Sequence, residues 1–84
     1  MIRMYELRQK EVINLGDGVR YGFVSDLELT EDGKIISIII PGPGRVLGVF
    51  GRDQEYSIPW ENINKIGEDI ILVDCDSSKV LVDG

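Results

Sequence analysis

Residues 30–40 read TEDGKIISIII, and this stretch decides the fold. Its Asp32-Gly33 pair stands between two strand-like runs, which is typical of a tight β-hairpin turn. Five isoleucines follow in the seven residues from Lys34 to Ile40; they favour a strand and leave it little polar face. We therefore predict a central strand over residues 34–40, covered on both sides.

Further turn signals and strand-like runs surround this stretch. Turns are indicated at residues 14–18, 41–44 and 66–69, where glycine, proline, aspartate and asparagine gather. Strands are indicated by alternation over residues 21–30, with Tyr21, Phe23, Leu27 and Leu29 on the apolar side, and by alternation at 56–60. Residues 63–66 and 69–74 are predicted to form the last hairpin. No helical period lasts ten residues. The pattern predicts an all-β antiparallel meander of about five to six strands, with one short helical turn near residues 60–63.

Composition and charge limit the classes of function. Eighty-four residues make one small domain, and the net charge of −6 opposes binding to DNA. One cysteine excludes an internal disulfide and fits a reducing compartment. The first residues show no signal peptide, and no apolar run approaches the ~20 residues of a membrane span. We expect a cytoplasmic protein.

No motif indicates catalysis or a cofactor. The chain has no histidine, so a Ser-His-Asp triad and a Cys/His zinc site are both excluded. Asp26 and Glu28 share one face of a strand, where two solvated carboxylates are the simpler interpretation than an acid–base pair. Asp74 and Asp76 flank Cys75 without calcium-loop spacing, so a solvated strand end is favoured over a cation site. We expect no enzyme activity, no metal and no cofactor.

One loop carries an unusual set of side chains. Large apolar residues occupy residues 44–52, and this loop lies in the only basic segment of an acidic chain. Exposed apolar groups beside arginine are typical of protein interfaces. The loop is either a lid over the core or a contact for a partner, and its arginines are either solvated or part of that contact. The predicted partner-binding residues are Arg45, Val46, Leu47, Val49, Phe50 and Arg52.

The order of short motifs along the chain resembles a known family, the PRC-barrel domain. The residues that carry the resemblance are Leu7–Asn14, Asp17-Gly18, Gly22–Asp26, Asp32–Ile35 and Tyr56–Ile63. The Pro-Gly-Pro-Gly-Arg segment at 41–45 and Phe-Gly-Arg-Asp at 50–53 make the chain similar to the small sporulation-associated members found in endospore-forming bacteria.

The resemblance implies a small, partly opened β-barrel over residues 4–76, followed by a tail at 77–84 that either adds a short edge strand or stays mobile. It implies a non-catalytic interaction module that binds an unidentified protein or a second copy of itself. Larger relatives occur in the cytoplasmic subunit of photosynthetic reaction centres and in a ribosome-maturation factor. An adaptor associated with the ribosome or with RNA is therefore the alternative function. Within the chain, Trp60 is expected in the core rather than on a binding platform.

Overall fold

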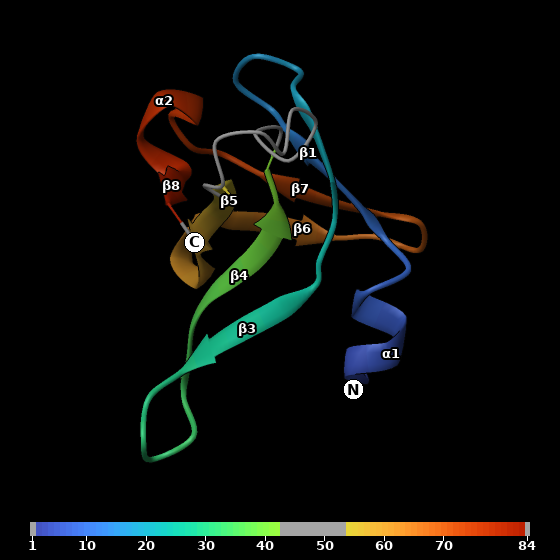
Figure 1. Cartoon of the computed structure of the whole chain (residues 1–84). Coiled ribbons are helices and arrows are strands. Elements are labelled where there is room, and N and C mark those ends of the chain that lie inside the picture. The colour runs from blue at the N-terminus through green and yellow to red at the C-terminus, as the bar shows by residue number, and fades with distance from the viewer. Residues whose placement is uncertain (1, 43–53, 84) are drawn as a thin grey trace.

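The computed structural model describes residues 2–42 and 54–83. Within these ranges the chain forms two short helices, one 3-10 turn and eight strands (Figure 1). In chain order they are α1 (Met4–Leu7), β1 (Glu11–Asn14), β2 (Arg20–Phe23), β3 (Asp26–Leu29), β4 (Ile35–Pro41), β5 (Gln54–Pro59), η2 (Trp60–Asn62), β6 (Ile63–Ile66), β7 (Ile70–Val73), α2 (Ser77–Val80) and β8 (Leu81–Asp83).

The strands form two four-stranded sheets. Sheet A has the order β2-β1-β7-β6, and sheet B has the order β3-β4-β5-β8. In the described ranges the two sheets are separate and do not join into one closed ladder, in keeping with a partly opened barrel. The predicted all-β class is confirmed. The described residues form eight strands rather than the expected five to six. Two pairings differ from a simple antiparallel meander, because β1 and β7 lie side by side in parallel and β8 pairs with the non-consecutive strand β5.

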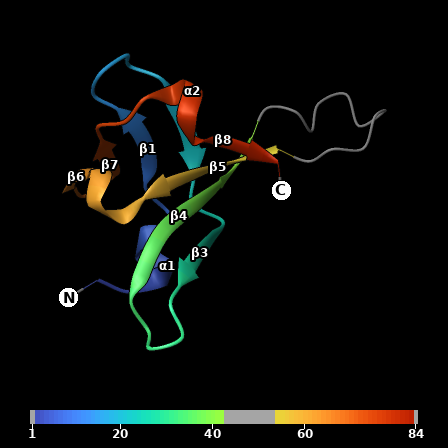
Figure 2. The ribbon, with the colours of Figure 1, turned by 90° about the vertical axis from the view of Figure 1, so that its left-hand side faces the viewer.

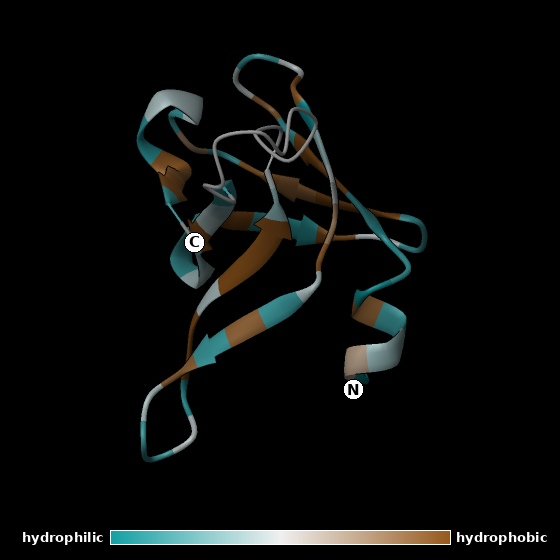
Figure 3. Ribbon diagram, viewed as in Figure 1, coloured by the Kyte–Doolittle hydropathy of each residue, from teal (hydrophilic) through white to brown (hydrophobic). Residues whose placement is uncertain are grey.

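The core lies between the two sheets. Sheet A contributes Val12, Ile71 and Val73, and sheet B contributes Ile38, Ile40 and Ile58; all six side chains are fully buried. The ribbon of β4 is accordingly mostly hydrophobic in Figure 3. Tyr56 and Trp60 are half-buried against this core, so the prediction that Trp60 belongs to the core is confirmed.

The hairpin of β3 and β4 follows the sequence prediction closely. Gly33 has a φ of +92°, a conformation that glycine adopts without strain, and its N–H donates to the Thr30 carbonyl at 2.9 Å. The Thr30 hydroxyl accepts from the Lys34 N–H at 2.9 Å. This hairpin extends away from the rest of the domain (Figures 1 and 2). As predicted, β4 is central, between β3 and β5.

The expected single strand over residues 21–30 is wrong. The chain forms β2 in sheet A and β3 in sheet B, with a break between Phe23 and Asp26. Gly22 has a φ of +105°, and the register with β1 shifts beside it, so the alternation of faces is lost. As a result Val24 is buried, whereas Phe23 is 52% exposed and Leu29 is 55% exposed.

Candidate functional site

One candidate surface is the outer face of sheet A, the side turned away from the core. Val12 and Ile71 are paired neighbours and both are fully buried, so the next residues along the strands, Ile13 and Leu72, pair on the opposite side. The same register places Phe23 beside Glu11. The outer face of sheet A consists of Glu11, Ile13, Arg20, Phe23, Lys65, Ile70 and Leu72.

Four of these seven residues are large and apolar. Phe23 is 52% exposed, and Ile13, Ile70 and Leu72 are half-buried. Burying apolar surface contributes about 25 cal/mol per Å², so covering this face with a partner would be favourable. Contiguous apolar surface with a charged rim is typical of sites where proteins bind one another.

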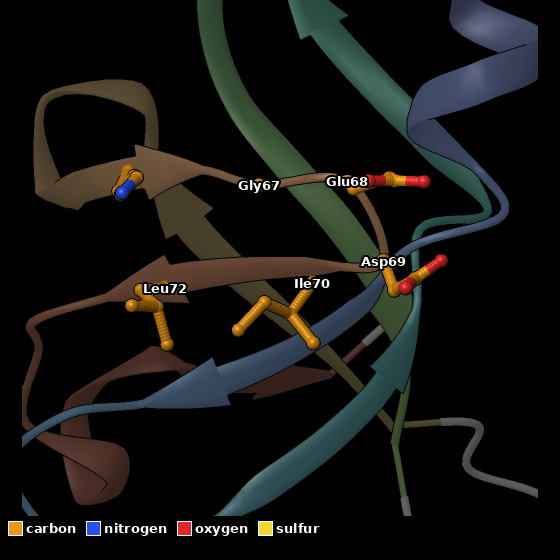
Figure 4. Close-up of a pocket in the computed structure, with 6 residues that line it drawn as sticks. Gly67, Glu68, Asp69, Ile70 and Leu72 are labelled. Carbon is orange, nitrogen blue, oxygen red and sulfur yellow. The ribbon is translucent and has the colours of Figure 1, made fainter.

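A pocket of about 380 Å³ lies at one end of this face (Figure 4). Ile70 and Leu72 of β7 form its apolar wall, and the turn between β6 and β7 closes one side with Glu68 and Asp69. Lys65, opposite Leu72 in β6, lines it as well. Gly67 has no side chain to fill the space; a Cβ there would stand 3.3 Å from the Ile70 carbonyl oxygen and 3.5 Å from its Cγ1.

A buried lysine holds the turn between β6 and β7 in place. The Lys10 side chain is only 8% exposed, and its Nζ donates to the Glu68 backbone carbonyl at 2.6 Å. The Glu11 N–H donates to the Asp69 carbonyl at 3.0 Å beside it. These two hydrogen bonds tie the turn to the start of β1 and leave the Glu68 and Asp69 side chains exposed.

An ion pair crosses the outer face between β1 and β2. The Arg20 guanidinium donates to the Glu11 carboxylate from Nη2 at 2.6 Å and from Nε at 3.0 Å. These hydrogen bonds hold the pKa of Glu11 below its usual value and raise the pKa of Arg20. Because the two charges neutralise each other, Ile13 and Phe23 are not flanked by an unpaired charge on this side.

A second cluster of polar side chains lies inside the domain, around Asn14. Asn14 is only 1% exposed. Its Nδ2 donates to the Cys75 carbonyl at 2.8 Å, and its Oδ1 accepts from the Cys75 N–H at 3.2 Å. The same amide group contacts Tyr21 Oη and Ser77 Oγ and accepts from the Gly16 N–H. The cluster joins the end of β1 to the segment that leads into α2.

Tyr21, Ser77 and Asp17 continue this cluster toward the surface. The Tyr21 and Ser77 hydroxyls are 2.5 Å apart, and Ser77 donates to Asp17 Oδ2 at 2.6 Å. Burial raises the pKa of Tyr21 to about 12, so its hydroxyl stays protonated at neutral pH. The Ser77 hydrogen bond lowers the pKa of Asp17. The groups are hydrogen-bonded to one another, and the arrangement ties α2 and β8 to sheet A.

The two acids expected on the solvent-facing side of β3 both accept hydrogen bonds from neighbouring groups of the domain. Asp26 and Glu28 are both exposed. Glu28 Oε1 accepts from the Ser37 hydroxyl at 2.5 Å and from the Ser57 hydroxyl at 3.2 Å, across three neighbouring strands of sheet B. Asp26 accepts from the Leu27 N–H at 2.8 Å. Within residues 2–42 and 54–83, no group of three or more His, Cys, Asp or Glu side chains is placed to hold a metal ion.

The predicted partner-binding residues Arg45, Val46, Leu47, Val49, Phe50 and Arg52 lie outside the described residues. Sequence reasoning missed the outer face of sheet A. One available signal was the run Ile70–Val73, which is apolar at four successive positions although only Ile71 and Val73 are buried. A strand that is apolar on both sides needs two covered faces.

None of the helices in the described part of the chain is long and apolar enough to cross a membrane.

Comparisons with known proteins agree with the architecture. The family model described as PRC-barrel domain matches residues 1–80. The chain is similar to the probable sporulation protein YlmC of Bacillus subtilis, with 47% identity over 74 residues that cover 87% of this chain and 91% of that protein. An uncharacterised protein of Clostridium acetobutylicum is 42% identical over 72 residues, covering 84% of this chain and 82% of its own. The uncharacterised protein YmxH of Bacillus subtilis is 34% identical over 76 residues, covering 87% and 88%.

Proposed function

Because the chain belongs to the PRC-barrel domain family, we propose that it is a non-catalytic protein-interaction module that serves sporulation in the cytoplasm of an endospore-forming bacterium. The similarity to a probable sporulation protein over most of both chains supports the cellular process. The interaction role is supported by the form of the domain's surface.

The main support for this proposal is the apolar surface on the outer face of sheet A. Phe23 is 52% exposed, and the half-buried Ile13, Ile70 and Leu72 extend the apolar surface across three strands. The Glu11–Arg20 ion pair is internally neutral, so a partner meets mainly apolar surface there. Removing that surface from water on binding would supply the driving force.

The loop predicted from the sequence supplies a second contact in this proposal. Val46, Leu47, Val49 and Phe50 would add apolar area, and Arg45 and Arg52 would orient the partner. This part rests on composition and on the basic character of residues 34–52.

Affinity capture with two matched variants tests the proposal. Phe23→Asp places a charge on the outer face of sheet A, whereas Leu29→Asp makes the same kind of change at a residue of nearly equal exposure, 52% against 55%, on the hairpin of sheet B. The wild-type chain, Phe23→Asp and Leu29→Asp would each be used as bait in cells entering sporulation. We expect one set of bound proteins with the wild type and with Leu29→Asp, and its loss with Phe23→Asp.

Equal protein capture by all three baits would contradict binding through this face. Capture of RNA that is released as salt rises would support the ribosome-associated alternative instead, because phosphate contacts weaken steeply with salt. An apolar protein contact is much less sensitive to salt.

A further inference from the structure

We propose that the outer face of sheet A binds a second copy of this chain, in a two-fold symmetric dimer centred on the pocket between Lys65 and the Glu68–Asp69 turn. This inference rests on the proposed function and names the partner for the same surface.

Opposite charges stand at the two ends of the pocket. Lys65 is paired with Leu72 in the hairpin of β6 and β7, while Glu68 and Asp69 lie in the turn that joins these strands. Leu72 and Asp69 are three residues apart, which is about 10 Å along an extended strand. Ile70 lies between the two ends, and Leu72 adds apolar surface beside Lys65 (Figure 4). The surface therefore has a basic end, an apolar middle and an acidic end.

These charges are available for a partner. Lys65, Glu68 and Asp69 are all exposed. The ion pair recorded between described residues joins Arg20 and Glu11, and the side chains at both ends of the pocket have no ion pair with another described residue.

If a two-fold axis passes through the apolar middle, the surface is complementary to the same surface of a second copy. In a two-fold contact the same patch is used by both copies, so each residue at one end meets the residue at the other end of its partner. Lys65 of each copy would then face Glu68 and Asp69 of the other, twice in one dimer. Each Leu72 and Ile70 would pack near the axis against the same residues of the second copy.

The net charge of the chain favours a contact that pairs unlike charges. Two copies that each carry a net charge of −6 repel one another on approach, so a stable contact has to bring unlike charges together. A surface with only acids would not dimerise, whereas the Lys65 end compensates the repulsion at the contact itself.

The size of the face predicts a weak dimer. Four strands spaced by about 4.8 Å and four residues long cover roughly 19 by 13 Å, which places the contact below the usual range of specific, stable protein interfaces. We therefore expect self-association at micromolar or higher concentration rather than a permanent dimer.

A charge-reversal experiment tests the proposed pairing. Sedimentation velocity of the wild type, Lys65→Glu, Asp69→Lys and an equimolar mixture of the two variants would be compared over concentrations up to about 1 mM. We expect reversible dimerisation of the wild type and a loss of at least about tenfold in affinity for each variant alone.

The mixture of the two variants should dimerise again. The glutamate introduced at position 65 of one copy would face the lysine introduced at position 69 of the other, and the native Lys65 and Asp69 would face each other at the second end of the contact. Lys34→Glu is the matched control, because Lys34 is an exposed lysine in the turn between β3 and β4. It changes the net charge as Lys65→Glu does and should dimerise as the wild type does.

A monomeric wild type over this range, or a dimer that Lys65→Glu does not weaken, or a mixture that stays monomeric, would each overturn the inference. The three single-site variants are all at exposed positions, and their thermal unfolding would be measured to exclude loss of fold. If the wild type is monomeric while Phe23→Asp still removes captured proteins, the dimer fails and the proposed function remains.

Discussion

Asn14 and Cys75, which are 61 residues apart in the chain, form two hydrogen bonds with each other. The Asn14 amide nitrogen donates to the Cys75 carbonyl at 2.8 Å, and the Asn14 side-chain oxygen accepts from the Cys75 N–H at 3.2 Å. One side chain thereby satisfies both backbone polar groups of Cys75, in the segment between β7 and α2. Since α2 leads directly into β8, this pairing helps to position the strand that completes sheet B at the edge of β5.

Replacing Asn14 by alanine should lower the free energy of unfolding by about 2–4 kcal/mol, because several buried donors and acceptors lose their partner at once. Denaturant unfolding of the wild type and the variant measures this difference. Asn64→Ala is the matched control, since Asn64 is exposed in β6, and it should change the free energy of unfolding by less than about 0.5 kcal/mol. Equal effects at the two positions would show that the Asn14–Cys75 pairing does not contribute to stability.

The raised pKa of Tyr21 predicts a loss of stability in alkaline solution. Its pKa is about 12 in the folded state, mainly because of burial, against the usual value of about 10 in an unfolded chain. The unfolded state therefore loses its proton first as pH rises. The contribution of Tyr21 is fully present below about pH 10 and is lost as the pH rises through about 12, by at most about 1.4 kcal/mol per pH unit.

Unfolding experiments at several pH values between about 9 and 12 would detect this decline, within the range set by the usual tyrosine pKa. Tyr21→Phe should be less stable at neutral pH by about 1 kcal/mol, through loss of the hydroxyl bonded to Ser77, and should show a shallower alkaline decline. Tyr5→Phe serves as the control, because Tyr5 is 70% exposed. If Tyr21→Phe and the wild type decline with the same slope, Tyr21 is not the group responsible.

Two isoleucines of β4 test which part of the strand lies in the core. Ile40 is fully buried in the core, whereas Ile36 lies in the same strand and is 50% exposed. Ile40→Ala should lower the free energy of unfolding by about 2–5 kcal/mol, and Ile36→Ala by less than about 1 kcal/mol. Thermal or denaturant unfolding of the two variants gives the comparison. A larger loss for Ile36→Ala would mean that the core lies nearer the hairpin end of the strand.

The elements that the sequence predicted well are those whose signals are local. The turn that ends in Gly33 and the isoleucine strand after it were both identified, because turn chemistry and β-branched composition act within a few residues. The run 21–30 was misjudged because its alternation is interrupted at Gly22, where φ is positive and the register with β1 shifts, and because the chain leaves sheet A after Phe23. The parallel pairing of β1 with β7 joins segments about 60 residues apart, and no local pattern encodes it.

The site was harder to predict for a related reason. Residues 44–52 attracted attention because apolar side chains stand out in a loop, and those residues lie outside the described ranges. The outer face of sheet A is assembled from one or two residues of each of four strands, such as Phe23 and Leu72. Considered alone, each of these residues is typical of an ordinary buried strand. Only the register shows that they share the side of the sheet away from the core.

Photo-crosslinking from Phe23 tests most directly whether the outer face of sheet A is a binding surface. A photoreactive phenylalanine analogue would replace Phe23 in one variant and Leu29 in another, because the two side chains are nearly equally exposed, at 52% and 55%, on different sheets. The account predicts a discrete crosslinked protein, a second copy of the chain or another partner, from position 23 in cells entering sporulation, and a much weaker or absent product from position 29. The same products from both positions, or none from position 23, would contradict it.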